Sequence, residues 1–123
     1  MIPLEPAHLV GTGGALGALL RQYVSSRVDG SELPVGTVTV NILGTFLLGF
    51  VTFLGMETEW LLLLGTGVAG SFTTFSSFSV ETVRLWDTGE RFRAVGNAVG
   101  TFLGAMFALG LAWGAVQLMN LLI

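Results

Sequence analysis

The sequence predicts an all-α integral membrane protein, a single domain over residues 1–123 with four transmembrane helices, the third interrupted in mid-membrane. Hydrophobic residues make up 52% of the chain, charged residues only 11%, and the mean hydropathy is +0.79. A soluble domain carries about 25% charged residues. Four apolar stretches also approach or exceed the length of about 20 residues that crosses a bilayer, and a run of serines and threonines divides the third.

The composition also excludes several functional classes. The chain has no cysteine and one histidine, so disulfides, cysteine-bound zinc, thiol chemistry and histidine metal clusters are excluded. No nucleophile–base pair or histidine–carboxylate relay is present, and we expect no enzymatic activity. The net charge is −3 and lysine is absent, which leaves no basic patch for a nucleic-acid partner.

The four predicted spans lie at about residues 7–24, 36–54, 60–84 and 94–122. Short charged segments separate them, so consecutive helices should be antiparallel neighbours. All five cations are arginines at or beyond span ends on one side of the membrane: Arg21, Arg27, Arg84, Arg91 and Arg93. By the positive-inside rule that side is cytoplasmic, which places the N- and C-termini outside. If Arg21 and Arg84 are buried and do not count, this side still carries three arginines and the other side carries none.

The first span carries small residues and a cation on one helical face. Gly14, Gly17 (or Ala18) and Arg21 recur at helical spacing. This pattern predicts a packing seam that ends near a polar pocket or lipid head groups. The alternative is a glycine seam with an interfacial arginine that extends its charge into the water.

The second span contains Asn41 on a stripe with Thr37, Gly44 and Leu48. A carboxamide inside an apolar helix normally faces protein or a water-filled cavity. Two interpretations of Asn41 stay open. It either forms an interhelical hydrogen bond or presents a donor to a ligand.

The third span begins with an ordinary apolar run at 60–69 and then changes character. Residues 70–79 include six hydroxyl side chains and three phenylalanines. Serine and threonine compete for backbone hydrogen bonds, and Gly70 beside Ser71 is a weak point, so we predict a break at about 70–74. Irregular backbone at that depth lines a cavity or is buried in protein, and its freed carbonyls can coordinate a cation.

Two side-chain patterns follow the predicted break. Phe75 and Phe78 share a helical face, while Thr74, Ser77 and Glu81 form a polar stripe. Rings at this spacing are commonly core residues. Beside a polar stripe, however, their electropositive edges can also approach an anion without holding it as an arginine would.

The fourth span combines a glycine ladder with two polar residues. Gly96, Gly100 and Gly104 recur every four residues, which predicts a helix-packing face. Asn97 and Thr101 form an i, i+4 polar pair. Thr101 is a candidate to line the same polar route as Ser77.

Three segments together resemble the Fluc (CrcB) family of fluoride channels, which are small four-helix proteins that assemble as antiparallel dimers. The segments are residues 13–21 (GGALGALLR), 34–44 (PVGTVTVNILG) and 70–81 (GSFTTFSSFSVE). The last is similar to the family's Thr-Thr-Phe-Ser-Thr-Phe signature. The resemblance covers essentially the whole chain.

The resemblance implies a passive fluoride channel in the cell membrane that exports cytoplasmic fluoride through two pores between inverted subunits. The implied pore residues are Asn41, Phe75, Phe78, Thr74, Ser77, Glu81, Thr101 and Arg21, the last near an aqueous mouth. The resemblance also implies a central sodium ion held by the main-chain carbonyls of Gly70 and Thr73 from both subunits. The chain departs from the family pattern at Ser71, where glycine is commoner, and at Asn97, where an aromatic hydroxyl is expected.

Two rival functions stay open at this point. A small dual-topology, proton-coupled multidrug exporter has similar size, but it needs a carboxylate inside the first span, and Glu5 precedes that span. A non-transporting membrane subunit would have a continuous, sealed third span.

The arginine distribution also bears on the partner. An inverted homodimer needs one sequence to insert in both orientations, which requires similar arginine and lysine counts on both sides. All five arginines lie on one side, so we expect a related subunit of opposite orientation. A homodimer that uses a minority of inverted chains is the competing interpretation.

Overall fold

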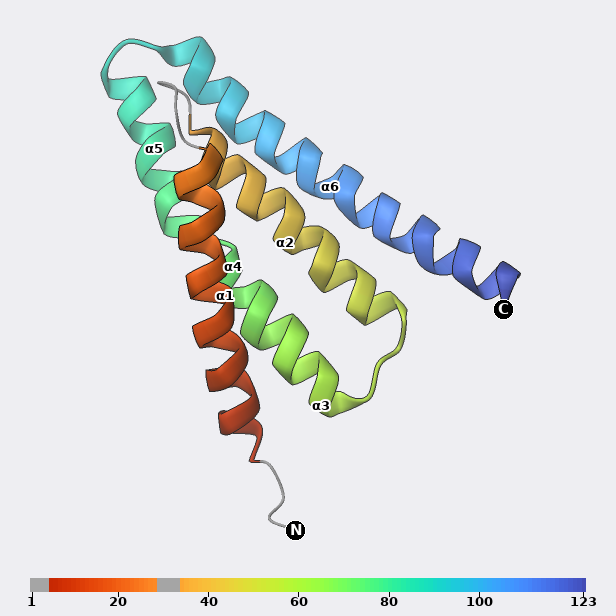
Figure 1. The fold of residues 1–123 in the computed structure, drawn as a ribbon. Helices are drawn as coiled ribbons and strands as arrows, with labels where there is room; N and C mark the ends of the chain where they lie inside the picture. The colour runs from red at the N-terminus through yellow and green to blue at the C-terminus, as the bar shows by residue number, and fades with distance from the viewer. Residues whose placement is uncertain (1–4, 29–33) are drawn as a thin grey trace.

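The computed structural model describes residues 5–28 and 34–123, and most of them are helical (Figure 1). Part of the first predicted loop, residues 29–33, lies outside the described residues. The elements in chain order are α1 (Pro6–Val28), α2 (Val35–Phe53), α3 (Thr58–Trp60), η1 (Leu61–Ala69), α4 (Gly70–Phe72), α5 (Phe75–Asp87) and α6 (Arg91–Leu122).

Within the described residues, three helical stretches are long and apolar enough to cross a membrane: Val35–Phe53, Thr58–Asp87 and Arg91–Leu122. The first predicted span forms α1, which is not among them. His8, Arg21 and Gln22, together with glycines and serines, lower the hydropathy of α1. The all-helical, membrane-type architecture is therefore confirmed, whereas a count of four spans stays a prediction.

The apolar run of the third predicted span is not an ordinary α-helix. Leu61–Ala69 forms the π-helix η1, whose turns are wider than those of an α-helix. Gly67 in this segment lies directly against Gly13 of α1, where an added Cβ would be 2.8 Å from the Gly13 Cα. The absence of side chains at both positions lets the two backbones approach. Apolar composition alone carries no signal for this geometry.

The chain changes its packing partners where the third predicted span is interrupted (Figure 1). Before the interruption, η1 and α4 pack mainly against α1, and η1 also contacts α2. After it, α5 packs mainly against α6, which runs along α2. The middle helix α2 therefore lies between the two halves of the molecule, and Val40 and Val51 of α2 are almost completely buried.

The glycine ladder of α6 is not its packing face within the subunit. Gly104 contacts Ile42 of α2, but Gly96 and Gly100 have no heavy atom of the described residues within 4 Å of an added Cβ. The buried face of α6 follows a different set of residues, Ala94, Asn97, Thr101, Ala108, Ala112 and Val116. Small alanines on this face allow close approach to α2, so they serve the purpose expected of the glycines.

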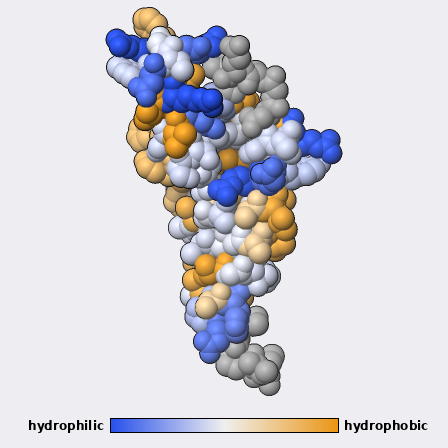
Figure 2. Space-filling model, turned by 90° about the vertical axis from the view of Figure 1, so that its left-hand side faces the viewer, coloured by the Kyte–Doolittle hydropathy of each residue, from blue (hydrophilic) through white to orange (hydrophobic). Residues whose placement is uncertain are grey.

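Arginine side chains lie near the end of the molecule that carries the turn between α5 and α6. Figure 2 shows hydrophilic residues toward the end that carries the turn between α5 and α6. At this end the guanidinium of Arg91 lies 5.0 Å from the centre of the Trp86 ring, and that of Arg27 lies 5.1 Å from the Tyr23 ring. Aromatic and arginine side chains are typical of a membrane–water interface.

Candidate functional site

The third predicted span is interrupted at Thr73 and Thr74, at the end of the predicted range 70–74. Thr73 has φ −81° and ψ 158°, and Thr74 has φ −147° and ψ 117°, so both are extended. Gly70 stays helical. We refer to these two threonines, between α4 and α5, as the interruption.

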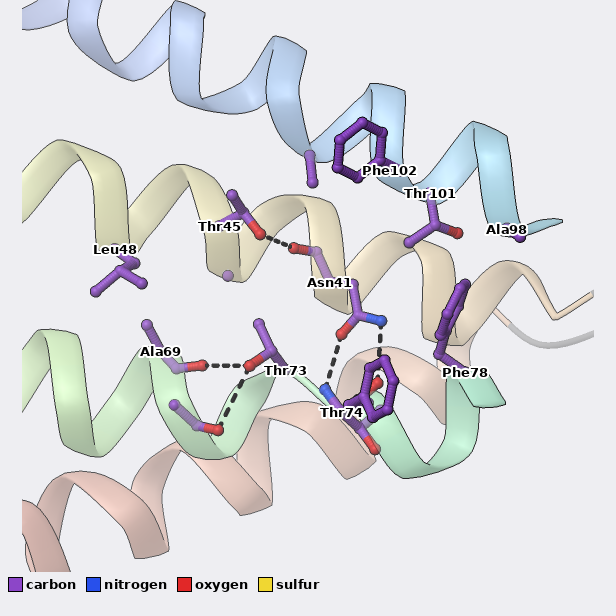
Figure 3. Close-up of a pocket in the computed structure, with 14 residues that line it drawn as sticks. Asn41, Thr45, Leu48, Ala69, Thr73, Thr74, Phe78, Ala98, Thr101 and Phe102 are labelled. Carbon is purple, nitrogen blue, oxygen red and sulfur yellow. Dashed lines mark hydrogen bonds between the residues drawn. The ribbon is translucent and has the colours of Figure 1, made fainter. Parts of the chain in front are cut away.

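Asn41 of α2 binds the main chain of the interruption with both ends of its carboxamide (Figure 3). The Thr74 N–H donates to Asn41 Oδ1 at 2.7 Å, and Asn41 Nδ2 donates to the Thr74 carbonyl at 3.1 Å. These bonds replace helical ones that the extended backbone cannot make. An amide has two N–H donors, and the described hydrogen bonds use one of them. Asn41 therefore combines interhelical bonding with a spare donor.

Thr74 also starts the helix that follows. Its Oγ1 accepts a hydrogen bond from the Ser77 N–H at 3.2 Å and lies 3.2 Å from Ser76 Oγ. This is the N-cap arrangement, in which a side-chain oxygen satisfies an amide of the first turn. The side chain of Thr74 is buried at the start of α5.

Helix α1 contacts the other residue of the interruption. Arg21 Nη1 donates to the Thr73 carbonyl at 3.3 Å. Gly17, one turn earlier, lies against Ser71 and the Val68 carbonyl, where an added Cβ would overlap both. The seam predicted on α1 therefore ends at the interruption, and it uses Gly13 rather than Gly14, which faces open space.

A cavity of about 340 Å³ lies between the interruption, α2 and α6 (Figure 3). We call it the central cavity. Its walls combine hydroxyl and amide groups, aromatic rings and small apolar residues, with no charged side chain among the described residues that line it. These residues are Asn41, Gly44, Thr45, Leu48, Ala69, Gly70, Thr73, Thr74, Phe75, Phe78, Ala98, Thr101, Phe102 and Ala105.

Two phenylalanines stand at the α5 side of the central cavity. The ring centres of Phe75 and Phe78 are 5.9 Å apart and the rings are tilted by 40°. Phe78 is half-buried, whereas Phe75 is 80% exposed in the isolated subunit. On the opposite wall, the buried Thr101 Oγ1 has no hydrogen-bond partner among the described residues. Ring edges and a spare hydroxyl both suit an anion.

The remaining predicted pore residues lie outside the central cavity. Glu81 accepts a hydrogen bond from Thr37 Oγ1 of α2 at 2.9 Å, and Ser77 is exposed. Arg21 lies on the far side of the interruption. Of the predicted stripe Thr74, Ser77 and Glu81, only Thr74 lines the cavity, because its position in the extended backbone turns it toward α2.

Sequence reasoning missed two polar residues near this region. Thr45 lines the cavity and donates to the Asn41 carbonyl at 2.6 Å, and its i+4 spacing from Asn41 was the available signal. Thr82 donates to the Phe78 carbonyl and accepts from Asn97. Its i+4 spacing from Phe78 was the corresponding signal.

The main-chain carbonyl oxygens of Gly70 and Thr73 are the type of ligand that a hard cation binds. In a continuous helix the Thr74 N–H would bind the Gly70 carbonyl, but here it binds Asn41. Among the described residues, the Gly70 carbonyl keeps only a 3.4 Å contact from Thr73 Oγ1, and the Thr73 carbonyl accepts from Arg21. The Gly70 carbonyl is therefore a ligand of the kind that hard cations accept, whereas a cation on the Thr73 carbonyl would lie beside the Arg21 guanidinium. The described residues contain no cluster of three or more histidine, cysteine or acidic side chains for a metal.

Comparisons with known proteins agree with this architecture. The sequence matches the family described as CrcB-like protein, Camphor Resistance (CrcB), over residues 8–114. Fluoride-specific ion channel FluC 2 of Haloarcula marismortui is 54% identical over 96% of this chain and 99% of that protein. Fluoride-specific ion channel FluC 1 of Halobacterium salinarum is 48% identical over 88% and 91%, and the FluC channel of Methanocaldococcus jannaschii is 41% identical over 80% and 83%. The chain belongs to the CrcB-like family.

Proposed function

We propose that this chain forms a passive, fluoride-selective ion channel that exports cytoplasmic fluoride and so lowers its intracellular concentration and toxicity. The observation that carries the proposal is the central cavity, where an amide, hydroxyls and ring edges surround a space and none of the described lining residues is charged. The names of the relatives support the same ion.

The chemistry of the cavity suits a small, strongly hydrated anion. A pore for such an ion must replace the hydrogen bonds of water without creating a deep trap. The spare N–H of Asn41, the Thr101 hydroxyl and the electropositive edges of Phe75 and Phe78 are donors of this kind. An arginine in the same place would bind the ion more strongly and slow its release.

The conducting unit that we propose is an antiparallel dimer in the cell membrane, with four spans in each subunit and the termini outside. The highly exposed Phe75 ring then becomes covered by the second subunit at the pore. The arginines at the ends of α1, α5 and α6 support a cytoplasmic location for this side. The same bias supports a related partner subunit of opposite orientation.

We further propose that the carbonyls of Gly70 and Thr73 hold a sodium ion at the centre of the dimer. When bound, this ion supplies a positive charge that lowers the cost of an anion in a medium of low dielectric constant. Asn41 contributes by binding the Thr74 N–H, which in a continuous helix would bind the Gly70 carbonyl.

Ion flux from liposomes tests the channel proposal. The protein, alone and co-expressed with a related subunit, is reconstituted into vesicles loaded with fluoride and chloride. We expect fluoride to leave without a proton gradient while chloride is retained. Equal release of both ions, or flux that requires a proton gradient, would contradict the proposal. The second outcome would favour the exporter class, although α1 carries no carboxylate.

A further inference from the structure

A hydrogen-bonded connection joins α5 to α6 beside the central cavity. Asn97 Nδ2 of α6 donates to Thr82 Oγ1 of α5 at 2.8 Å. The same hydroxyl donates to the Phe78 carbonyl at 2.7 Å. We call this connection the Asn97–Thr82 link. It attaches α6 to the main chain of Phe78 through a hydroxyl that both accepts and donates.

Helix α5 buries little of its surface within the subunit. Within α5, all of whose residues the structure describes, Leu85 alone is buried. A hollow of about 270 Å³ lies between α5 and α6 beside Thr82, next to the small Ala94 and Ala98. This hollow is open on the outer surface of the subunit, so it adds no buried contacts that would hold α5 against α6. The position of α5 therefore depends on polar contacts at the Thr74 end, on the bond from Thr37 of α2 to Glu81, and on the Asn97–Thr82 link, which is the one of these that reaches α6.

The link is placed where it controls the cavity. Phe78 precedes Thr82 by one helical turn on α5, and Asn97 precedes Thr101 by one turn on α6, so each pair shares a face. Phe78 and Thr101 stand on the α5 and α6 walls of the central cavity (Figure 3). A bond one turn away fixes the separation between the Phe78 ring and the Thr101 hydroxyl.

The burial of the link gives it more weight than a surface contact has. Asn97 is 9% exposed and Thr82 is half-buried. Because a buried amide that loses its partner carries the cost of desolvation, the bond resists breaking as the helices fluctuate. A fully exposed pair would exchange with water at little cost.

We propose that Asn97 and Thr82 are positioning residues for ion selectivity in this channel. They hold α5 against α6 so that the gap between Phe78 and Thr101 admits fluoride and excludes the larger chloride ion. Without the link, α5 moves away from α6, the gap widens and chloride passes. This inference rests on the proposed function, because it assumes that an anion crosses the central cavity.

Fluoride and chloride efflux from liposomes test the selectivity. The variants are Thr82→Val, which keeps the shape of the side chain and removes both bonds, Asn97→Leu, and the double variant. We expect the fluoride-to-chloride ratio to fall about fivefold in each single variant, since a hydrogen bond of ordinary net strength corresponds to about that factor. The double variant should be no worse than either single one.

Two controls separate positioning from general damage. Thr82→Ser keeps the hydroxyl and should keep the ratio. Thr52→Val removes an exposed hydroxyl that bonds only within α2, and it should also leave the ratio unchanged. An unchanged ratio in folded Thr82→Val, or additive losses in the double variant, would overturn the inference. A parent protein without fluoride flux would instead overturn the proposed function.

A distance measurement tests the positioning without any ion flux. The chain has no cysteine, so Val80→Cys on α5 and Val99→Cys on α6 provide two exposed sites for spin labels. Labelled subunits are diluted with unlabelled ones so that only distances within a subunit are seen. We expect Asn97→Leu to broaden the α5–α6 distance distribution. An identical distance distribution would show that the link does not hold α5 against α6. Because the distance measurement does not depend on ion flux, it tests the positioning role even in a variant that conducts no ion.

Discussion

At the scale of single residues, Asn41 is the side chain on which the interruption depends most. Its carboxamide binds both the N–H and the carbonyl of Thr74. A main-chain pair left unbonded inside a membrane protein is costly, since no water is present to replace the lost partner. The sequence identified Asn41 as a polar group facing protein or a ligand, but its partner 33 positions away could not be read from helical spacing.

Asn41→Leu should therefore damage both stability and flux. The substitution keeps the approximate volume and leaves two main-chain groups of Thr74 unpaired, so we expect the free energy of unfolding to fall by about 2 kcal/mol or more. Thermal or denaturant unfolding in detergent measures this change. Thr39→Val is the matched control, because it removes a hydroxyl that bonds only within α2. Equal stability of Asn41→Leu and the parent would show that these bonds contribute nothing.

Phe78→Ile should separate the electrostatic contribution of the Phe78 ring edge from the contribution of the side chain to packing. Isoleucine fills much of the space of the half-buried ring but has no electropositive edge. We expect fluoride efflux per folded assembly to fall at least about tenfold, whereas the melting temperature changes little because such a volume change usually costs less than about 1.5 kcal/mol. Phe75→Ile should act in the same direction. A large loss of stability with normal flux per folded assembly would return the rings to a packing role.

At the scale of elements, the docking of α1 against η1 and α4 decides where Arg21 meets the interruption. Gly13 and Gly17 lie on backbone atoms of η1 and on Ser71, and Arg21 follows one turn later. This order makes the position of α1 sensitive to a single methyl group.

Gly17→Ala should displace α1. The added methyl overlaps Ser71 Oγ and the Val68 carbonyl, and a backbone atom cannot move aside cheaply. We expect a loss of about 1–3 kcal/mol of stability in thermal unfolding. Gly14→Ala is the control, because open space surrounds Gly14 and alanine favours a helix by up to about 1 kcal/mol. If the two variants behave alike, the α1 seam does not lie where the structure has it.

The sequence predicted the position of the third-span interruption well. It did not predict the geometry of η1 or the packing of α6. The cluster of serines and threonines at 70–79 marked a segment unsuited to a continuous helix. The exact residues depend on long-range bonds: Thr73 N–H still bonds to the Ala69 carbonyl, and the helix ends only where Asn41 captures Thr74. The π-helix η1 and the outward position of Gly96 and Gly100 on α6 depend on tertiary packing, for which single-helix patterns carry no signal.

At the scale of the whole molecule, the arginine distribution predicts a partner. A single preferred orientation cannot supply both halves of an antiparallel dimer. We expect tags on the two termini to be accessible only from outside intact cells, and flux to require co-expression of a related subunit of opposite bias. C-termini found equally on both faces, together with flux from this chain alone, would support a homodimer instead.

The bonds that hold the interruption also constrain how the protein is made. Arg21 and Thr73 are 52 positions apart, and Asn41 and Thr74 are 33 apart, so neither bond can form while the third span is entering the bilayer by itself. Extended backbone exposed to lipid is not tolerated, so the interruption needs α1 and α2 beside it to supply partners for its main chain. The interruption is thus completed by assembly within the membrane: a third span without α1 and α2 beside it would lack the partners of Thr73 and Thr74.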